Sequence, residues 1–279
     1  MPTFDTPRPI DVTVDIEMGL VRFTAADTAE TVVEVLPGSD SAERDVKAAR
    51  ETRVDFSGGR LEVRTPKSRV VFGRPGSVTV HITVPAGSRL TGTAAISDFV
   101  GEGPFGDCRL KTAAGKIRLE TVGAARLTTQ LGDITVGDMA GDADVSSSTG
   151  EIQIGSIDGA AVVQNSNGAV RIGVCTGSLE VKAPNGRTTV GLAESSVKWK
   201  ASAGSLVLEE VVRGTFDLET RAGDIEIGIR EGTAAWLDAK SQVGGVHNAL
   251  PASEGPKGSA ETADIKARTA IGSITVRRP

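Results

Sequence analysis

The sequence predicts an all-β fold: a single-stranded parallel β-solenoid (β-helix) of about 18 residues per coil, with an irregular β-rich N-terminal region and a C-terminal cap. Three observations predict it. A glycine motif recurs at a near-constant spacing, a second apolar strand keeps the same spacing, and a corner residue follows each motif at a fixed distance. A stack of coils explains all three, because like residues then lie on like residues in neighbouring coils.

The first register is a glycine, one further residue, and then apolar-x-apolar, as in GKIRL at Gly115 and GDITV at Gly132. Successive motifs are 17, 18, 18, 18, 18 and 19 residues apart. Strand alternation turns the two apolar residues inward, and the glycine permits a positive φ at the turn. The motif glycines are Gly115, Gly132, Gly150, Gly168, Gly186, Gly204 and Gly223.

The second register is a strand between successive glycine motifs, and we expect its central residue to be buried. These residues are Leu110, Leu127, Val145, Val163, Val181, Trp199, Leu218 and Leu237. A corner position follows five residues after the first apolar residue of each motif, at Val122, Met139, Ile157, Cys175, Ala193 and Val211. A left-handed hexapeptide helix also has 18-residue coils, but it needs three equivalent strands, and this sequence has two strands and a corner.

Residues 1–90 have β character without the strict period, and we expect an irregular β-rich region with one short helix at about 41–51. Asp40 and Glu43 resemble a capping box at the start of that helix. Ser57-Gly58-Gly59 predicts a hairpin turn. The solenoid repeats are expected over residues 91–250.

Residues 251–279 are predicted to form a loop followed by capping strands. A solenoid ends in an open edge that must be covered, and the strands between Ala263 and Arg278 could return to cover it. Strand alternation places Trp236 outward, so we expect this returning segment to cover the indole as well.

Composition argues against several classes of function. The net charge is −5 with acids and bases interleaved, so no basic stripe indicates nucleic-acid binding. No apolar run approaches the ~20 residues of a membrane span, and no secretory signal is visible, so we expect a cytoplasmic protein. The two cysteines, Cys108 and Cys175, make no disulfide framework or thiolate zinc site, and we expect both to be buried, reduced and unpaired. We expect no cofactor and see no small-molecule ligand.

The GDIxV-type motif, together with the lead-in VTVHITVPAGSRL at residues 78–90, resembles a bacterial β-strand-repeat family of unknown function often labelled "putative adhesin". The resemblance covers nearly the whole chain. It implies surface exposure, which the absence of a visible export signal does not support. It supplies no catalytic residues.

Three acids share one outward position after the turn glycine: Asp133, Glu151 and Asp224. Stacked carboxylates can act as a general acid and base in polysaccharide hydrolysis. The same column also holds Lys116 and Arg187, and a column of mixed sign favours a solvated ladder. We therefore predict no catalytic and no metal-binding residues. His81 and His247 have no nearby partner in the sequence, and we expect both to be solvated.

The sequence therefore predicts a non-catalytic structural or protein-interaction scaffold, an adhesin-like rod that binds a protein partner or associates with itself. The alternative is a carbohydrate-active β-helix enzyme that acts through the outward acidic residues. A partner-contact loop is predicted where three cations surround an apolar triplet, with Lys67, Arg69, Phe72 and Arg74 as its residues.

Overall fold

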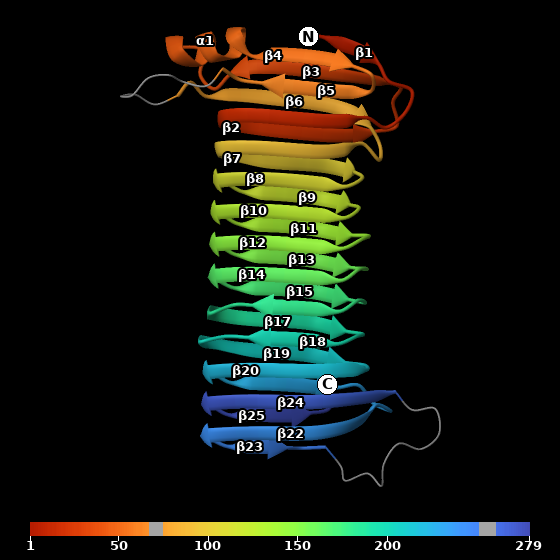
Figure 1. Ribbon diagram of the computed structural model, residues 1–279, viewed down its shortest axis with the longest axis vertical. Helices are drawn as coiled ribbons and strands as arrows, with labels where there is room; N and C mark the ends of the chain where they lie inside the picture. The colour runs from red at the N-terminus through yellow and green to blue at the C-terminus, as the bar shows by residue number, and fades with distance from the viewer. Residues whose placement is uncertain (67–74, 251–260) are drawn as a thin grey trace. The chain divides into compact units, whose positions relative to one another are not determined.

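The computed structural model describes residues 1–66, 75–250 and 261–279 (Figure 1). The predicted all-β parallel solenoid is confirmed: the described chain forms strands throughout, apart from one short helix. The chain divides into two compact units, Met1–Ala140 and Gly141–Pro279. The predicted division at residues 90 and 250 stays a prediction.

Unit 1 contains the N-terminal region and the first regular coils. Its elements are β1 (Thr3–Asp5), β2 (Asp11–Ala26), β3 (Glu30–Pro37), α1 (Glu43–Glu51), β4 (Arg53–Ser57), β5 (Arg60–Arg64), β6 (Val78–Pro85), β7 (Arg89–Pro104), β8 (Cys108–Ala114), β9 (Ile117–Val122), β10 (Ala125–Leu131) and β11 (Ile134–Met139). From β8 onward each coil contributes two strands, which pair in parallel with the equivalent strands of the next coil. Leu110 lies opposite Leu127 and Ile117 opposite Ile134, as the repeat predicts.

The first coils of unit 1 are stacked out of chain order. Strand β2 is long enough to span a whole coil; it pairs in parallel with β5 and β6 on one edge and with β7 on the other. The N-terminal strand is therefore held between two segments that come later in the sequence (Figure 1).

Antiparallel strands and the helix complete the other side of unit 1. Strand β3 pairs antiparallel with β1 and β6, and β4 pairs antiparallel with β5. The predicted helix and the hairpin turn are confirmed, with φ of 58° at Gly58 and 74° at Gly59. The predicted capping box is wrong: the N-cap is Ala42, which has no side-chain cap. Asp45 anchors the helix instead, because its carboxylate accepts the Ser77 N–H at 3.0 Å.

Unit 2 continues the two-strand coils. Its strands are β12 (Ala143–Thr149), β13 (Ile152–Ile157), β14 (Ala161–Asn167), β15 (Val170–Cys175), β16 (Leu179–Lys182), β17 (Asn185–Ala193), β18 (Val197–Lys200), β19 (Ala203–Val211), β20 (Gly214–Ala222), β21 (Ile225–Ile229), β22 (Ala234–Val243), β23 (Val246–Asn248), β24 (Thr262–Ile271) and β25 (Ile274–Arg277). The predicted register holds through the middle of the unit, where Trp199 lies between Val181 and Leu218.

The C-terminal strands correct one expectation. Strand β24 pairs in parallel with β20 on one edge and with β22 on the other, and β25 lies in the same way between β21 and β23 (Figure 1). The last strands are thus one coil inside the stack, and β22 and β23 form the terminal coil in place of the predicted cap. Trp236 on β22 does point outward, but it is 65% exposed, so the prediction that residues 263–278 cover it is wrong.

A polar column runs through the core beside the turn glycines. The residue three positions before each glycine points inward, and its side chain commonly donates a hydrogen bond to the carbonyl of the turn glycine in the neighbouring coil. The pairs are Thr129 with Gly115, Asn165 with Gly150, Thr220 with Gly204, Thr269 with Gly223 and Ser241 with Gly272, at 2.8–3.1 Å. These bonds link the polar column of one coil to the turn of the next.

Candidate functional site

The three outward acids do not form a shared site but have separate local partners. Asp133 lies 3.0 Å from the Lys116 ammonium. Glu151 forms an ion pair with Arg171. The Asp224 carboxylate accepts the Ser273 N–H at 2.8 Å. This is the arrangement of a charge ladder, in which each acid is satisfied by a group of the neighbouring coil.

Two further outward acids show the electrostatic effect of such ladders. A hydrogen bond from the neighbouring Lys182 lowers the pKa of Glu180. A hydrogen bond from Arg268 lowers the pKa of Asp238 in the same way. A general acid that works near neutral pH needs a raised pKa, so ladder partners of this kind oppose that role.

The predicted burial of both cysteines is confirmed, and the two histidines differ in exposure. His81 is half-buried on β6 and His247 is exposed on β23. Cys108 and Cys175 are buried, and each is a free thiol. Burial raises the pKa of Cys108 to about 12 and that of Cys175 to about 11, so both thiols are poor nucleophiles at neutral pH. Within residues 1–66, 75–250 and 261–279, no group of three or more His, Cys, Asp or Glu residues could hold a metal ion.

A shallow polar hollow of about 380 Å³ opens on the outward face of unit 1. Strands β2, β5, β7 and β8 supply its walls, with Asp107 from the turn before β8. It is lined by Asp11, Val12, Thr13, Arg60, Glu62, Arg89, Leu90, Thr91, Asp107 and Arg109.

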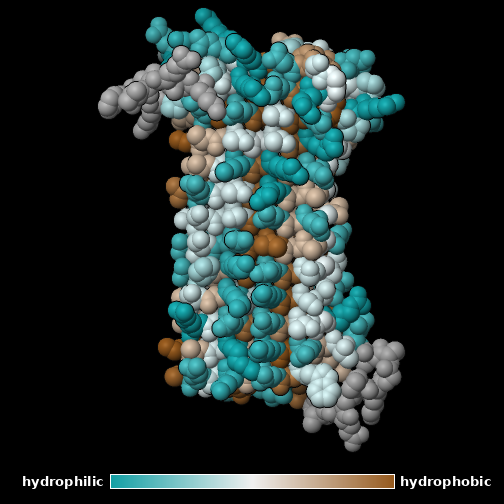
Figure 2. All heavy atoms as spheres, in the orientation of Figure 1, coloured by the Kyte–Doolittle hydropathy of each residue, from teal (hydrophilic) through white to brown (hydrophobic). Residues whose placement is uncertain are grey.

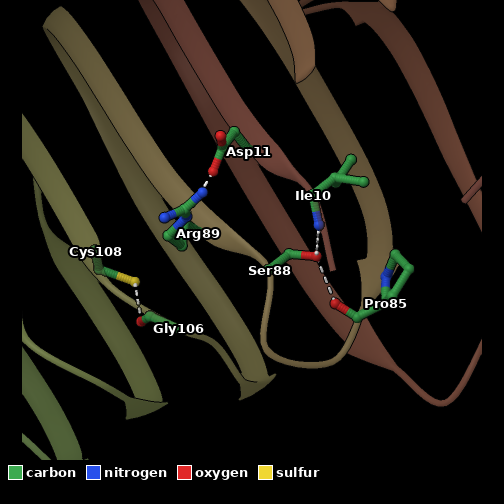
Figure 3. Close-up of polar contacts among 7 residues, drawn as sticks. All are labelled: Ile10, Asp11, Pro85, Ser88, Arg89, Gly106 and Cys108. Atoms are coloured by element: carbon green, nitrogen blue, oxygen red, sulfur yellow. Dashed lines mark hydrogen bonds and ion pairs between the residues drawn. The ribbon is translucent and has the colours of Figure 1, made fainter. Parts of the chain in front are cut away.

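An acid between two arginines marks the centre of this hollow. Asp11 on β2 lies opposite Arg60 on one side and opposite Arg89 on the other. The Arg89 Nε donates to the Asp11 carboxylate at 2.6 Å (Figure 3). Two guanidinium groups beside one carboxylate leave donor capacity on the surface, because each guanidinium has five N–H donors.

The backbone beneath the hollow is held by a buried serine. Ser88 is fully buried; its hydroxyl donates to the Pro85 carbonyl at 2.7 Å and accepts the Ile10 N–H at 3.1 Å (Figure 3). This contact fixes the start of β2 against the start of β7. The charged side chains above therefore project from a rigid base.

The hollow is suited to contact with a polar surface. Three arginines and three acids alternate around it, and arginine can bind a carboxylate through two parallel hydrogen bonds. The sequence does not predict this hollow, because its residues come from four strands that only the out-of-order position of β2 brings together. The predicted contact loop of Lys67, Arg69, Phe72 and Arg74 lies outside the described residues. No described helix is long and apolar enough to cross a membrane.

Comparison with known proteins gives one family. The sequence model of the Toastrack DUF4097 family matches residues 12–277. A search of curated protein sequences finds no match.

Several solved structures are similar to the chain. One is described as a "putative adhesin" from Parabacteroides distasonis, with 12% identity, coverage of 100% of this chain and 95% of that chain, and a TM-score of 0.37. Another "putative adhesin", from Bacteroides fragilis, has 10% identity, coverage of 99% and 95%, and a TM-score of 0.34. A "putative lipid binding protein" from Parabacteroides distasonis has 11% identity, coverage of 100% and 95%, and a TM-score of 0.36.

Proposed function

We propose that this chain, which belongs to the Toastrack DUF4097 family, is a non-catalytic interaction scaffold whose outward strand faces bind a protein partner. The observation that carries the proposal is the ladder of local ion pairs along regular parallel strands. Examples are Lys116 with Asp133 at 3.0 Å and Lys200 with Glu219 at 3.3 Å. Ladders of this kind give a polar face of fixed geometry.

Rigidity supports the proposal because binding then costs little conformational entropy. Lys200 and Glu219 project from strands that are paired in register, and Lys116 and Asp133 directly precede such strands, so the face needs little ordering when a partner binds. Solenoid proteins commonly use such extended faces for recognition. Figure 2 shows hydrophilic residues in rows on the visible face.

The hollow of unit 1 is the proposed centre of contact. Arg60 and Arg109 border it on either side of the Arg89–Asp11 pair, and an acidic segment of a partner would satisfy their remaining donors. The loop of Lys67, Arg69, Phe72 and Arg74 remains a second proposed contact, and a cytoplasmic location remains part of the proposal, to be tested by cell fractionation.

The test is affinity capture with matched charge variants. Immobilised wild-type protein should retain a host protein that the double variant Arg60→Glu/Arg109→Glu loses. The control variant Arg187→Glu/Arg221→Glu has the same net charge at exposed positions in unit 2 and should retain it. Equal retention by both variants would exclude the hollow.

Activity assays test the alternative that the chain is a carbohydrate-active enzyme. The wild-type protein should release no reducing ends from a panel of bacterial and plant polysaccharides. Release that disappears in Asp133→Asn or Glu151→Gln would overturn the proposal in favour of a carbohydrate-active enzyme.

A further inference from the structure

We propose that the terminal coil of unit 2 binds a second copy of this chain, with β22 pairing antiparallel to the β22 of the partner. The first observation is an open edge. Among the described residues, β22 pairs only with β24 and β23 pairs only with β25, so each has one edge without a strand. A long unpaired edge strand is a template for a further strand.

Exposed apolar side chains lie along the same strands. Among the described residues of unit 2, the large hydrophobic residues that are exposed all belong to β22, β23 and β24. They are Trp236 at 65%, Val243 at 65%, Val246 at 43% and Ile271 at 60%. The inward residues Ala235, Leu237 and Ala239 are only half-buried, although their counterparts in β24 are fully buried. Apolar side chains left exposed along a terminal coil are compatible with cover by another chain.

The N-terminal region of unit 1 is built differently, because its described edge strands are short. There the parallel coils give way to the antiparallel strands β3 and β4, the three-residue β1 and the helix α1. Short edge strands and a covering helix are the usual protection against edge pairing. The terminal coil of unit 2 has no covering helix among the described residues, and although β23 has three residues, β22 is a ten-residue strand.

The backbone of β22 allows antiparallel pairing with its own copy. The Ala234 N–H donates to the Glu261 carbonyl oxygen at 2.8 Å. Because backbone directions repeat every second residue of a strand, the even-numbered residues of β22 direct their N–H and C=O groups toward β24. The odd-numbered residues from Ala235 to Ser241 therefore direct theirs to the open edge, because these directions alternate along a strand. A two-fold axis at Ala239 would place the odd-numbered residues of one β22 opposite the odd-numbered residues of the other, as an antiparallel ladder between these edges requires.

Charge selects this register among its neighbours. With the axis at Ala239, Asp238 faces the partner's Lys240, and Lys240 faces the partner's Asp238. The neighbouring registers that keep odd residues paired have the axis at Leu237 or Ser241, and they place no charged residue opposite Asp238 or Lys240. Opposite charges stabilise a cross-strand pair and like charges destabilise it, so the sequence of β22 is complementary to itself in one register.

The intramolecular contacts are compatible with this arrangement. Asp238 pairs with Arg268 on β24, and its side chain is still 67% exposed. Lys240 lies opposite Arg268 on β24, and the Asp238 carboxylate of its own strand is already engaged by Arg268. The partner's Asp238 would bring a second carboxylate to this pair of cations.

Sedimentation equilibrium of the full chain tests the inference by charge reversal and rescue. The wild type should be a dimer, and Lys240→Asp should raise its dissociation constant about tenfold or more. The double variant Asp238→Lys/Lys240→Asp restores opposite charges across the axis and should restore the dimer. Asp27→Lys, at an exposed turn of unit 1, is the control and should leave the dimer unchanged.

Cross-linking tests the position of the axis. Ala239→Cys should form a disulfide between two copies, because residues opposite each other in a hydrogen-bonded antiparallel pair lie about 5.5 Å apart between Cα atoms. Ser241→Cys, which would face the partner's Leu237, is the matched control and should cross-link less. A wild type that stays monomeric, or a dimer that Lys240→Asp does not weaken, would overturn the inference. Either result leaves the proposed scaffold function in unit 1 untouched.

Discussion

Trp199 shows how a single large residue is accommodated in a core of narrow columns. It is fully buried between Val181 and Leu218, and its Nε1–H donates to the Thr188 hydroxyl at 3.0 Å. The sequence predicts the burial of Trp199. It also shows GRTTV at Gly186 as an irregular copy of the motif, and the hydrogen bond explains the irregularity, since Thr188 takes the place of an aliphatic residue.

Replacing this indole should be costly. Trp199→Ala should lower the free energy of unfolding by about 3–5 kcal/mol, through lost burial and a residual cavity. Denaturant unfolding followed by circular dichroism measures it. A loss below about 1 kcal/mol would contradict the observed packing, because large-to-small substitutions in a tight core cost more than that.

The partner hydroxyl can be tested separately. Thr188→Val keeps the shape of the side chain and leaves the indole N–H buried without an acceptor, which should cost about 1–3 kcal/mol. In the Trp199→Phe background, where no N–H needs an acceptor, the same substitution should be nearly neutral. Equal costs in the two backgrounds would show that the hydrogen bond does not matter for stability.

The cysteines link burial to pH. Burial raises the pKa of Cys108 to about 12, so above the ordinary thiol pKa the unfolded chain loses a proton that the native chain keeps. The contribution of Cys108 to stability should therefore be constant below pH 9 and fall as the pH rises toward 12. Comparison of unfolding free energies between the wild type and Cys108→Ala over this range measures it; a pH-independent difference would contradict the burial.

Neither thiol should react rapidly with a thiol reagent in the native protein at pH 8.

At the scale of the coil, the turn glycine and the polar column together permit the close approach of neighbouring coils. Gly223 has φ of 143°, and a Cβ there would lie 2.0 Å from the Gly204 carbonyl oxygen. Thr220 donates to that same carbonyl at 3.1 Å. The close approach of two coils thus depends on a glycine at one position and a hydroxyl three residues before it.

Substitution of a turn glycine should separate steric contact from backbone freedom. Gly223→Ala should destabilise unit 2 by several kcal/mol, since a backbone clash adds to the strained φ. Gly58→Asn is the matched control: φ is 58°, nothing lies within 4 Å of the added Cβ, and asparagine tolerates this region. Thermal unfolding should show a large loss for the first variant and little change for the second.

Local pattern predicts what lies inside a coil, but not the order in which coils stack. The repeat correctly predicts inward residues such as Leu127 and Ile134, since each belongs to a strict alternation. It cannot order the last coils, because Ser241 before Gly244 and Thr269 before Gly272 satisfy the same polar column equally well. The hollow around Asp11 is missed for the same reason, since it depends on which strands lie beside β2.

At the scale of the whole chain, the inserted C-terminal strands should decide whether the terminal coil folds. Deletion of residues 251–279 removes β24, the strand with which β22 pairs. We expect the amides of residues 234–248 to exchange rapidly in the truncated protein, while residues 143–211 stay protected. Hydrogen exchange at low protein concentration measures both. Protection of residues 234–248 would show that β22 can pair directly with β20.

The two out-of-order insertions also bear on how the chain folds during synthesis. Strand β2 leaves the ribosome early, but it is held between β5–β6 and β7, so its coil cannot close before residue 104 has been made. Strands β22 and β23 must likewise wait for β24 and β25. The central repeats can form one after another from local contacts, whereas each end requires a long-range closure, and such closures slow folding. A nascent chain that pauses near residue 250 would therefore present an unfinished stack to the cell.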